Sequence, residues 1–328
     1  MSSALITVLL PVYNGAADVE QAVMSILGQT HTDFELLIIN DGSKDNSAEI
    51  LEGLCDSRIR LIHQENMGLA ATLNRGIDLA NGRYIARQDQ DDLSLPTRLE
   101  KQLTYMELNP DCALLGTRAE IWVGNTRSDR AHDHPVEPGG ICFDLLFDNP
   151  FVHSSMMMRR DAVKAMGGYS VDPLRQPPED YELWSRMARC YGVANLPERL
   201  LVYREVPQSM SRVTGNRFLD KIVTISAENL AHAIGVEQPD SVCFDIAAIE
   251  HSAFHRLSAQ PNIKQMCDVV ILAGNNIANR THTPQVVQLA KSRAVTLRYK
   301  FLMYRARLLW IKPLLRGMRF LASKLYSR

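Results

Sequence analysis

The chain has 328 residues, of which 46% are hydrophobic and 22% are charged, and its formal net charge at pH 7 is -1. This is the composition of an ordinary globular protein, and the length suffices for one large domain with an appendage. No apolar run approaches the roughly 18 residues that a membrane-spanning helix needs, which predicts a soluble or peripheral protein.

The charges are distributed unevenly along the chain. All 37 acidic residues lie at or before Asp268, whereas 12 of the 36 lysines and arginines follow it. A basic tail on an acidic body predicts a polyanionic partner, either an anionic membrane surface or a nucleic acid.

The six cysteines are widely spaced and form no C-x-x-C pattern. This spacing indicates neither a zinc site nor a disulfide framework and favours a reducing compartment. Because no basic segment followed by an apolar core opens the chain, we expect no signal peptide.

The first part of the chain alternates strands with helices. Three times, an apolar segment typical of a buried strand precedes a segment with helical spacing, and a fourth strand begins at residue 84. The pattern predicts a parallel sheet covered by helices. The first three expected strands are residues 5–10, 34–39 and 58–63, and the expected helices are 17–27, one that ends near 54, and 69–80.

The remaining elements are predicted less regularly. We expect a helix at residues 96–108, strand structure in 113–123, and a polar surface loop at 124–140. An apolar run at 156–158, a helix at 181–190, short strands at 193–196 and 200–204, and helices from about 216 follow.

Polar clusters follow three of the expected strands at the point where each strand ends. They are Tyr13–Asn14, Asp41–Ser43 and Asp89–Asp92. Ligands of parallel sheets bind beyond the carboxyl ends of the strands, so the three clusters predict one pocket. The chain has no G-x-G-x-x-G after its first strand and no G-x-x-x-x-G-K-[ST], which disfavours a dinucleotide site and a P-loop.

Carboxylates dominate the third cluster. Asp89 and Asp91 are two residues apart, so both can turn towards one hard cation that offsets their repulsion. In isolation, a D-x-D-D motif is more often a solvated acidic turn than a metal site. Further on, Glu179 and Asp180 immediately precede an expected helix, as capping acids do. A carboxylate at Asp180 beside the pocket also suits a general base.

The tail has a separate pattern. An apolar stripe at helical spacing is bordered by basic residues, and a second basic amphipathic segment follows Pro313. This pattern predicts helices in the plane of an anionic membrane interface, with Trp310 and Tyr304 at the depth of the headgroups. The alternative is a helix packed on the protein body. The stripe consists of Leu297, Phe301, Tyr304, Leu308 and Ile311.

Together, these motifs resemble the family 2 glycosyltransferases of GT-A fold, of the type that builds bacterial cell-envelope polysaccharides. The resemblance extends over about residues 4–212. The motifs that carry it are Pro11-Val12-Tyr13-Asn14, Asn40-Asp41-Gly42-Ser43-x-Asp45, Asn66-x-Gly68, Asn74, Gly82-x-Tyr84-Ile85, Asp89-x-Asp91-Asp92, His153-Ser154-Ser155, Gly167-Gly168-Tyr169, Glu179-Asp180-x-x-Leu183-Trp184 and Leu200-x-x-Tyr203-Arg204.

The resemblance implies an α/β fold with a mostly parallel, Rossmann-like sheet flanked by helices. We expect a nucleotide-sugar-binding catalytic domain at residues 1–212 and a helical C-terminal region at 213–328. Its basic tail, from about 291 to 328, is expected to associate with the inner face of the cytoplasmic membrane.

The implied activity is inverting transfer of a hexosyl or N-acetylhexosaminyl group. The donor would be a nucleotide-diphosphate sugar, most often a UDP-sugar, and the acceptor a hydroxyl of a lipid-linked or cell-envelope glycan. Mn²⁺ or Mg²⁺ would neutralise the charge that develops on the leaving diphosphate. Two alternatives stay open: a non-catalytic nucleotide-sugar-binding module, and a nucleic-acid-binding protein, against which the acidic body and the absence of a binding motif argue.

Carried over by position, the resemblance also implies roles for single residues. Tyr13 would lie against the base and Asp41 would hydrogen-bond it. Asp89 would approach the ribose or the metal, Asp91 would bind the metal, and Asp180 would deprotonate the acceptor. Further donor residues would be Pro11, Asn14, Asn66 and Asn74, and the acceptor or supporting residues would be Asp92, His153, Glu179, Trp184 and Arg204.

One position departs from the family pattern. Many members carry a histidine two residues after the Tyr-Arg pair, where this chain has Val206. The third protein ligand of the metal is therefore left open, and Arg204 gains importance as a supporting residue.

Overall fold

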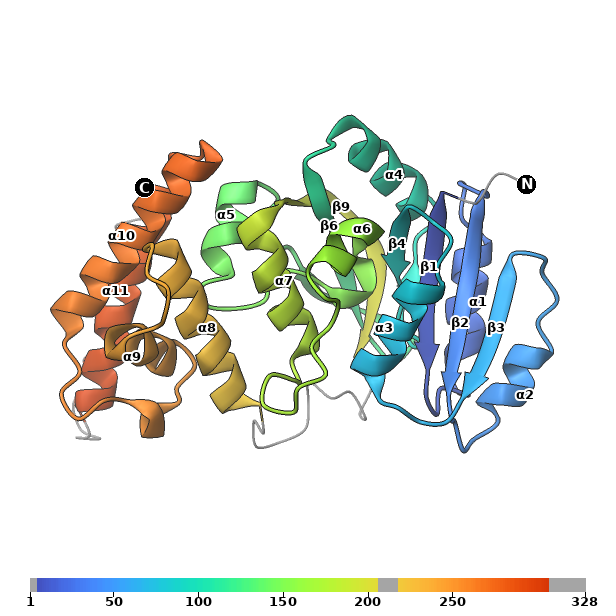
Figure 1. Cartoon of the computed structure of the whole chain (residues 1–328), viewed down its shortest axis with the longest axis horizontal. Helices are drawn as coiled ribbons and strands as arrows, with labels where there is room; N and C mark the ends of the chain where they lie inside the picture. Colours follow the sequence, from blue (N-terminus) through green and yellow to red (C-terminus); the bar gives the residue numbers. More distant parts are fainter. Residues whose placement is uncertain (1–4, 206–217, 307–328) are drawn as a thin grey trace. The chain divides into compact units, whose positions relative to one another are not determined.

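The computed structural model describes residues 5–205 and 218–306 (Figure 1). The chain divides into two compact units, Met1–Lys221 and Ile222–Arg328. The described part of the first unit combines a sheet with helices, and that of the second unit is helical. No described helix is long and apolar enough to cross a membrane.

The first unit is built on one twisted sheet. Its described strands lie in the order β3-β2-β1-β4-β8-β6-β9-β5, with β7 paired to β6 outside this path. Their bounds are β1 (Ile6–Val12), β2 (Phe34–Asp41), β3 (Ile59–Gln64), β4 (Tyr84–Arg87), β5 (Leu93–Ser94), β6 (Cys112–Val123), β7 (Thr126–His132), β8 (Met157–Arg159) and β9 (Gly192–Glu205).

Helices lie between these strands in the chain. They are α1 (Val19–Leu27), α2 (Ser47–Glu52), α3 (Leu69–Leu79), α4 (Arg98–Leu108), α5 (Pro138–Asp144), α6 (Arg160–Ala165) and α7 (Glu179–Cys190), with a 3-10 turn, η1, at His153–Ser155. Every residue of β1 is buried, because α1 and α3 cover the sheet. A strand covered on both faces requires the continuous apolar run seen in the sequence.

The predicted α/β fold is confirmed, and the pairing adds detail. Strands β3, β2, β1 and β4 are parallel neighbours, as the strand–helix alternation predicts. The sheet becomes mixed at β8, which is antiparallel to both β4 and β6. Parallel pairing directs the ends of β1, β2 and β4 to one edge of the sheet.

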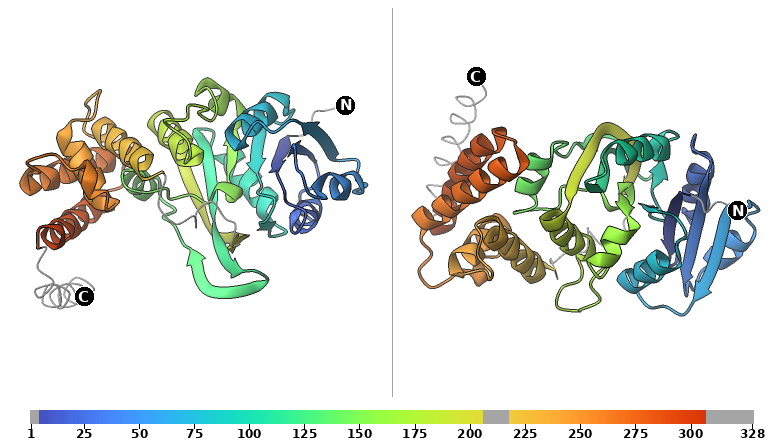
Figure 2. Two further views of the ribbon diagram at one scale, coloured as in Figure 1. Left: turned by 90° about the horizontal axis from the view of Figure 1, so that it is seen from below. Right: turned by 45° about the horizontal axis from the view of Figure 1, so that its top comes forward.

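Two sequence predictions about local structure are wrong. The expected loop at 124–140 contains β7, which forms a hairpin with β6 (Figure 2). Val123 pairs with Thr126, so Gly124 and Asn125 make a two-residue turn, and Gly124 has a φ of +59°. Such Gly-Asn turns join hairpin strands, and β7 lacks an apolar pattern because its residues are largely exposed. The two short strands expected at 193–204 are one continuous strand, β9.

The described part of the second unit contains four helices and a short 3-10 turn. They are α8 (Leu219–Ala233), which crosses the unit boundary, α9 (Ser241–Glu250), η3 (Phe254–Arg256), α10 (Ile263–Thr281) and α11 (Gln285–Arg305). Helix α11 packs against α9 and α10.

The orientation expected for the apolar stripe of the tail is wrong within α11. Leu297 is fully buried, Phe301 is 8% exposed, and the Tyr304 ring stacks on Phe254. These side chains pack inside the protein because the surfaces of neighbouring helices offer the same apolar environment that a membrane would. The rest of the stripe, and all of 307–328, lies outside the described residues.

The close approach of Gly82 to β1 gives a first prediction. A methyl group on Gly82 would lie 2.4 Å from the backbone nitrogen of Thr7, which cannot move without disturbing β1. We expect Gly82→Ala to lower the free energy of unfolding by about 1–3 kcal/mol in urea denaturation. The matched control is Gly53→Ala, whose methyl would meet no atom closer than 3.4 Å. Equal stability of the two variants would contradict the packing described here.

Candidate active site

The loops that follow β1, β2 and β4 are joined by hydrogen bonds. The Gln90 side chain accepts from the Tyr13 N–H (2.8 Å) and donates to the Tyr13 carbonyl (3.1 Å). Asn14 donates its N–H to the Ser43 hydroxyl (3.0 Å), and its side-chain oxygen accepts from the Lys44 N–H (2.7 Å). The structure therefore brings the three predicted clusters together at one edge of the sheet.

Asp41 holds the turn after β3. Its carboxylate accepts from the backbone N–H groups of Met67 (2.8 Å) and Gly68 (3.0 Å) and from the Gln64 amide (2.6 Å). The Asn66 amide donates to the Asp41 carbonyl (3.0 Å). Asp41 and Asn66 thus lie together at the site edge. Much of the hydrogen-bonding capacity of the Asp41 carboxylate is used within the protein.

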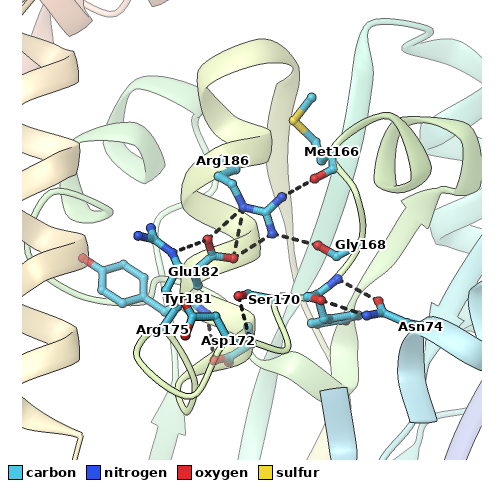
Figure 3. A network of polar contacts seen from close by, with 11 residues as sticks. Asn74, Met166, Gly168, Ser170, Asp172, Arg175, Tyr181, Glu182 and Arg186 are labelled. Carbon is cyan, nitrogen blue, oxygen red and sulfur yellow. Dashed lines mark hydrogen bonds and ion pairs between the residues drawn. The ribbon is translucent and has the colours of Figure 1, made fainter. Parts of the chain in front are cut away.

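Two residues that the sequence places at the donor make contacts within the protein. Pro11 is buried within β1. The Asn74 amide donates to the Tyr169 carbonyl and accepts from the Tyr169 N–H, both at 2.8 Å (Figure 3). Asn74 therefore ties α3 to the segment after α6. Its amide is engaged with the backbone of Tyr169, and its expected role at the donor stays a prediction.

A buried cation accompanies Asp89. The Arg87 side chain is fully buried, and one of its Nη atoms lies 2.5 Å from Asp89 Oδ1. Burial opposes ionisation of Asp89, but the charge of Arg87 and the proximity of His153 hold its pKa below the ordinary value. Asp89 is thus ionised, with one oxygen committed to Arg87. Arg87 was missed in the sequence, although an arginine inside an apolar strand requires a partner.

Asp91 has the freest carboxylate of this loop. Burial and the charge of Asp89 raise its pKa to about 6, and Asp18 adds to the effect. The only hydrogen bond described for this carboxylate comes from its own backbone N–H. A cation beside Asp91 would offset these unfavourable charges.

The donor set near Asp91 fits a divalent cation that is shared with a ligand. Within the described ranges, no group of three or more His, Cys, Asp and Glu side chains is placed to hold a metal by itself. Mg²⁺ is commonly bound by one or two carboxylates together with substrate phosphates and water. Asp91, assisted by Asp89, meets that requirement.

Asp92 and Arg204 support the site from within the protein. The buried Asp92 carboxylate accepts from the Arg204 N–H (2.8 Å), and burial beside other carboxylates raises its pKa well above the ordinary value. The Arg204 guanidinium binds Asp18 (3.0 Å) and Gln21 (2.5 Å) at the start of α1. It is therefore directed to the start of α1, as a supporting residue would be. Val206 lies outside the described residues.

A second pair of carboxylates lies in the first turn of α7. Asp180 accepts from the Asn149 amide (2.8 Å) and from the Tyr181 N–H (2.7 Å). Burial raises the pKa of Asp180, and the charge of Asp89 raises it further. Burial and the charge of Asp180 raise the pKa of Glu179 to about 7. The Asp89 N–H donates to the Ser154 hydroxyl (2.8 Å), so the segment 149–154 contacts both the loop after β4 and the first turn of α7.

Aromatic side chains line this site. His153 Nε2 lies 3.0 Å from the Tyr169 hydroxyl, and burial together with Arg87 lowers the His153 pKa to about 3, so the ring is neutral. The Trp184 ring is fully buried, with its centroid 5.8 Å from that of His153 and 5.9 Å from that of Tyr169. Trp184 thus packs behind the His153 and Tyr169 rings, and its expected role on the acceptor side stays a prediction.

An ion-pair network fixes the segment between α6 and α7 (Figure 3). Glu182, with a side chain only 3% exposed, pairs with Arg175 (3.1 Å) and Arg186 (2.7 Å). Arg186 also donates to the carbonyls of Met166 and, at 2.7 Å, Gly168. The network holds this segment on α7 and so positions the first turn of that helix.

Comparison with known proteins agrees with this geometry. Residues 7–167 match the family model described as glycosyl transferase family 2. The chain is 30% identical over 241 residues to an uncharacterized glycosyltransferase of Haemophilus influenzae, covering 70% of this chain and 74% of that protein. It is also 30% identical to the amylovoran biosynthesis glycosyltransferase AmsE of Erwinia amylovora, covering 69% and 86%.

A solved structure shares the fold. Residues 1–349 of Staphylococcus aureus TarS, in complex with UDP-GlcNAc, match with a TM-score of 0.60 at 14% identity. The match covers 92% of this chain and 91% of that one.

The pKa of Glu179 gives a prediction for stability. Its folded-state pKa of about 7 lies above the ordinary 4.5, so the wild-type protein loses stability as the pH rises between these values. Glu179→Gln removes this loss. We expect it to raise the free energy of unfolding by up to about 3 kcal/mol at pH 8, with little gain at pH 4.5. The exposed Glu65→Gln is the control, and a gain in Glu179→Gln that does not change with pH would refute the burial argument.

Proposed function

The chain belongs to glycosyl transferase family 2, and we propose that it moves a sugar from a nucleotide-diphosphate sugar to a hydroxyl of a glycan acceptor. The observation that carries the proposal is the pair of carboxylate groups, one after β4 and one in the first turn of α7, that the segment 149–154 connects by hydrogen bonds. Metal-assisted donor binding and proton removal from an acceptor need carboxylates with these two separate roles.

The relatives support the kinds of substrate. AmsE is named for amylovoran biosynthesis, and TarS is bound to UDP-GlcNAc. We therefore propose a UDP-sugar as the donor, carrying a hexosyl or N-acetylhexosaminyl group. As the acceptor we propose a lipid-linked or cell-envelope glycan at the inner face of the cytoplasmic membrane.

The donor side is assigned to the ends of β1, β2 and β4. The Tyr13 side chain is 47% exposed, which leaves its ring available to stack on a nucleobase. Asp41 keeps acceptor capacity beyond its three internal donors, since a carboxylate has about four lone-pair sites. Asp91 and Asp89 would hold a Mn²⁺ or Mg²⁺ ion, which, when bound, would neutralise charge on the leaving diphosphate.

The acceptor side is assigned to α7 and the residues around it. Asp180 removes the proton of the acceptor hydroxyl as that oxygen attacks the anomeric carbon. The Asn149 amide and the Tyr181 N–H orient the Asp180 carboxylate, and its raised pKa makes it a stronger base than a solvated aspartate. A single displacement from the face opposite the diphosphate inverts the anomeric configuration.

Replacement of the proposed base tests the acceptor half. We expect Asp180→Asn to lower kcat for sugar transfer by about 10²–10⁴-fold, because the amide cannot accept the proton. Its KM for the donor should change little. The control is Asp111→Asn, which alters an exposed carboxylate away from the site. Wild-type kcat in Asp180→Asn would show that another group is the base.

Replacement of the proposed metal ligand tests the donor half. We expect Asp91→Asn to weaken Mn²⁺-dependent binding of UDP by at least about tenfold in calorimetry, since one charged ligand of the cation is lost. Binding of UDP to the wild-type protein that does not depend on a divalent cation would contradict this assignment. Cation-dependent UDP binding without transfer to any tested acceptor would instead favour a non-catalytic binding module.

A further inference from the structure

Two cations on the inner side of helix α11 are neutralised by a carboxylate of α9. Arg293 and Lys300 both reach the Glu250 carboxylate of α9, at 3.3 Å and 2.6 Å. The Glu250 side chain is only 3% exposed, and those of Arg293 and Lys300 are 30% and 35% exposed. These two basic residues therefore have a structural function in the second unit.

The outer side of the same helix carries a different stripe. We call it the α11 stripe, and it recurs at intervals of three and four residues along one face of the helix. Its two apolar members, Val295 and Leu302, are 50% and 54% exposed. Its members are Lys291, Val295, Arg298, Leu302 and Arg305.

The three cations of the α11 stripe form no ion pair with any residue of the described ranges. Arg298 donates to the Cys267 sulfur (3.2 Å), and the Arg305 guanidinium lies 5.8 Å from the centre of the Phe301 ring. Both residues, like Lys291, remain exposed. The positive charge of this face is thus available to a partner.

The neighbouring sequence adds charge of the same sign. Helix α11 contains no Asp or Glu, and none occurs anywhere after Asp268. Six further lysines and arginines follow α11 in the sequence. A face with unpaired cations and no acidic residue complements an anionic surface.

We propose that the α11 stripe docks on an anionic lipid bilayer. Exposed aliphatic side chains between the cations favour this partner over a nucleic acid. Val295 and Leu302 can enter the boundary between headgroups and acyl chains while the basic side chains extend to the phosphates. The α11 stripe differs from the apolar residues that the sequence pattern assigned to the membrane, of which Leu297, Phe301 and Tyr304 pack against neighbouring residues of the unit. The proposal goes beyond sugar transfer and does not depend on it.

Sedimentation of the full-length protein with vesicles tests the proposal. The vesicles contain either phosphatidylglycerol mixed with phosphatidylcholine or phosphatidylcholine alone. We expect binding to the anionic vesicles and a loss of about 30-fold in affinity for the double variant Lys291→Gln, Arg305→Gln, from two lost charges. The control variant Lys264→Gln, Arg280→Gln removes two exposed charges from α10, and its binding should stay close to that of the wild type.

A second variant tests the apolar part at constant charge. Val295→Ser with Leu302→Ser should also weaken binding to anionic vesicles, because two exposed aliphatic side chains no longer enter the bilayer. Equal binding of the wild type and both stripe variants would overturn the proposal. So would equal binding to the two kinds of vesicle, or binding to an oligonucleotide with none to anionic vesicles. Circular dichroism of each variant establishes that the helices are intact.

Discussion

The first unit depends on the way buried charge is balanced where β4 ends. Arg87 and Arg98 are both fully buried, and each is costly to remove from water unless its donors are satisfied. Arg87 is paired with Asp89, whereas Arg98 donates to the backbone carbonyls of Arg87 (2.7 Å) and Met156 (3.2 Å). Burial and the charge of Arg87 lower the pKa of Arg98 to about 9, so it stays charged at neutral pH. Arg98 thus joins the end of β4 to Met156, which precedes β8, and Arg87 stabilises the acidic loop that follows β4.

This balance gives neighbouring carboxylates different properties. Arg87 keeps Asp89 ionised, whereas burial with like charges raises the pKa of Asp91 to about 6 and raises that of Asp92 well above its ordinary value. The pKa values of three aspartates within four residues therefore shift in different directions because their surroundings differ. Differences of this kind allow one loop to combine a structural acid with a ligand-binding one.

Sequence reasoning was most successful where the determining interactions are local. The strand–helix alternation and the polar residues at strand ends were predicted because each depends on neighbours in the chain. The Asn74–Tyr169 pair joins residues 95 positions apart, and the buried site of Trp184 depends on rings from several elements. The partners of Arg87 and the commitments of the Asp41 carboxylate likewise exist only in the folded chain. The polar clusters at the strand ends were therefore predictable, but the internal contacts that their side chains make were not.

The C-terminal helix shows why a helical pattern alone does not identify its partner. An apolar stripe bordered by cations satisfies a protein interior and a bilayer equally well, because both remove aliphatic surface from water. Charge pairing separates the two cases. Arg293 and Lys300 on the inner side of α11 form ion pairs with the buried Glu250 carboxylate. The cations of the α11 stripe have no ion pair among the described residues and remain hydrated. One helix can thus present an inner face that stabilises the fold and an outer face whose charge is unused by it.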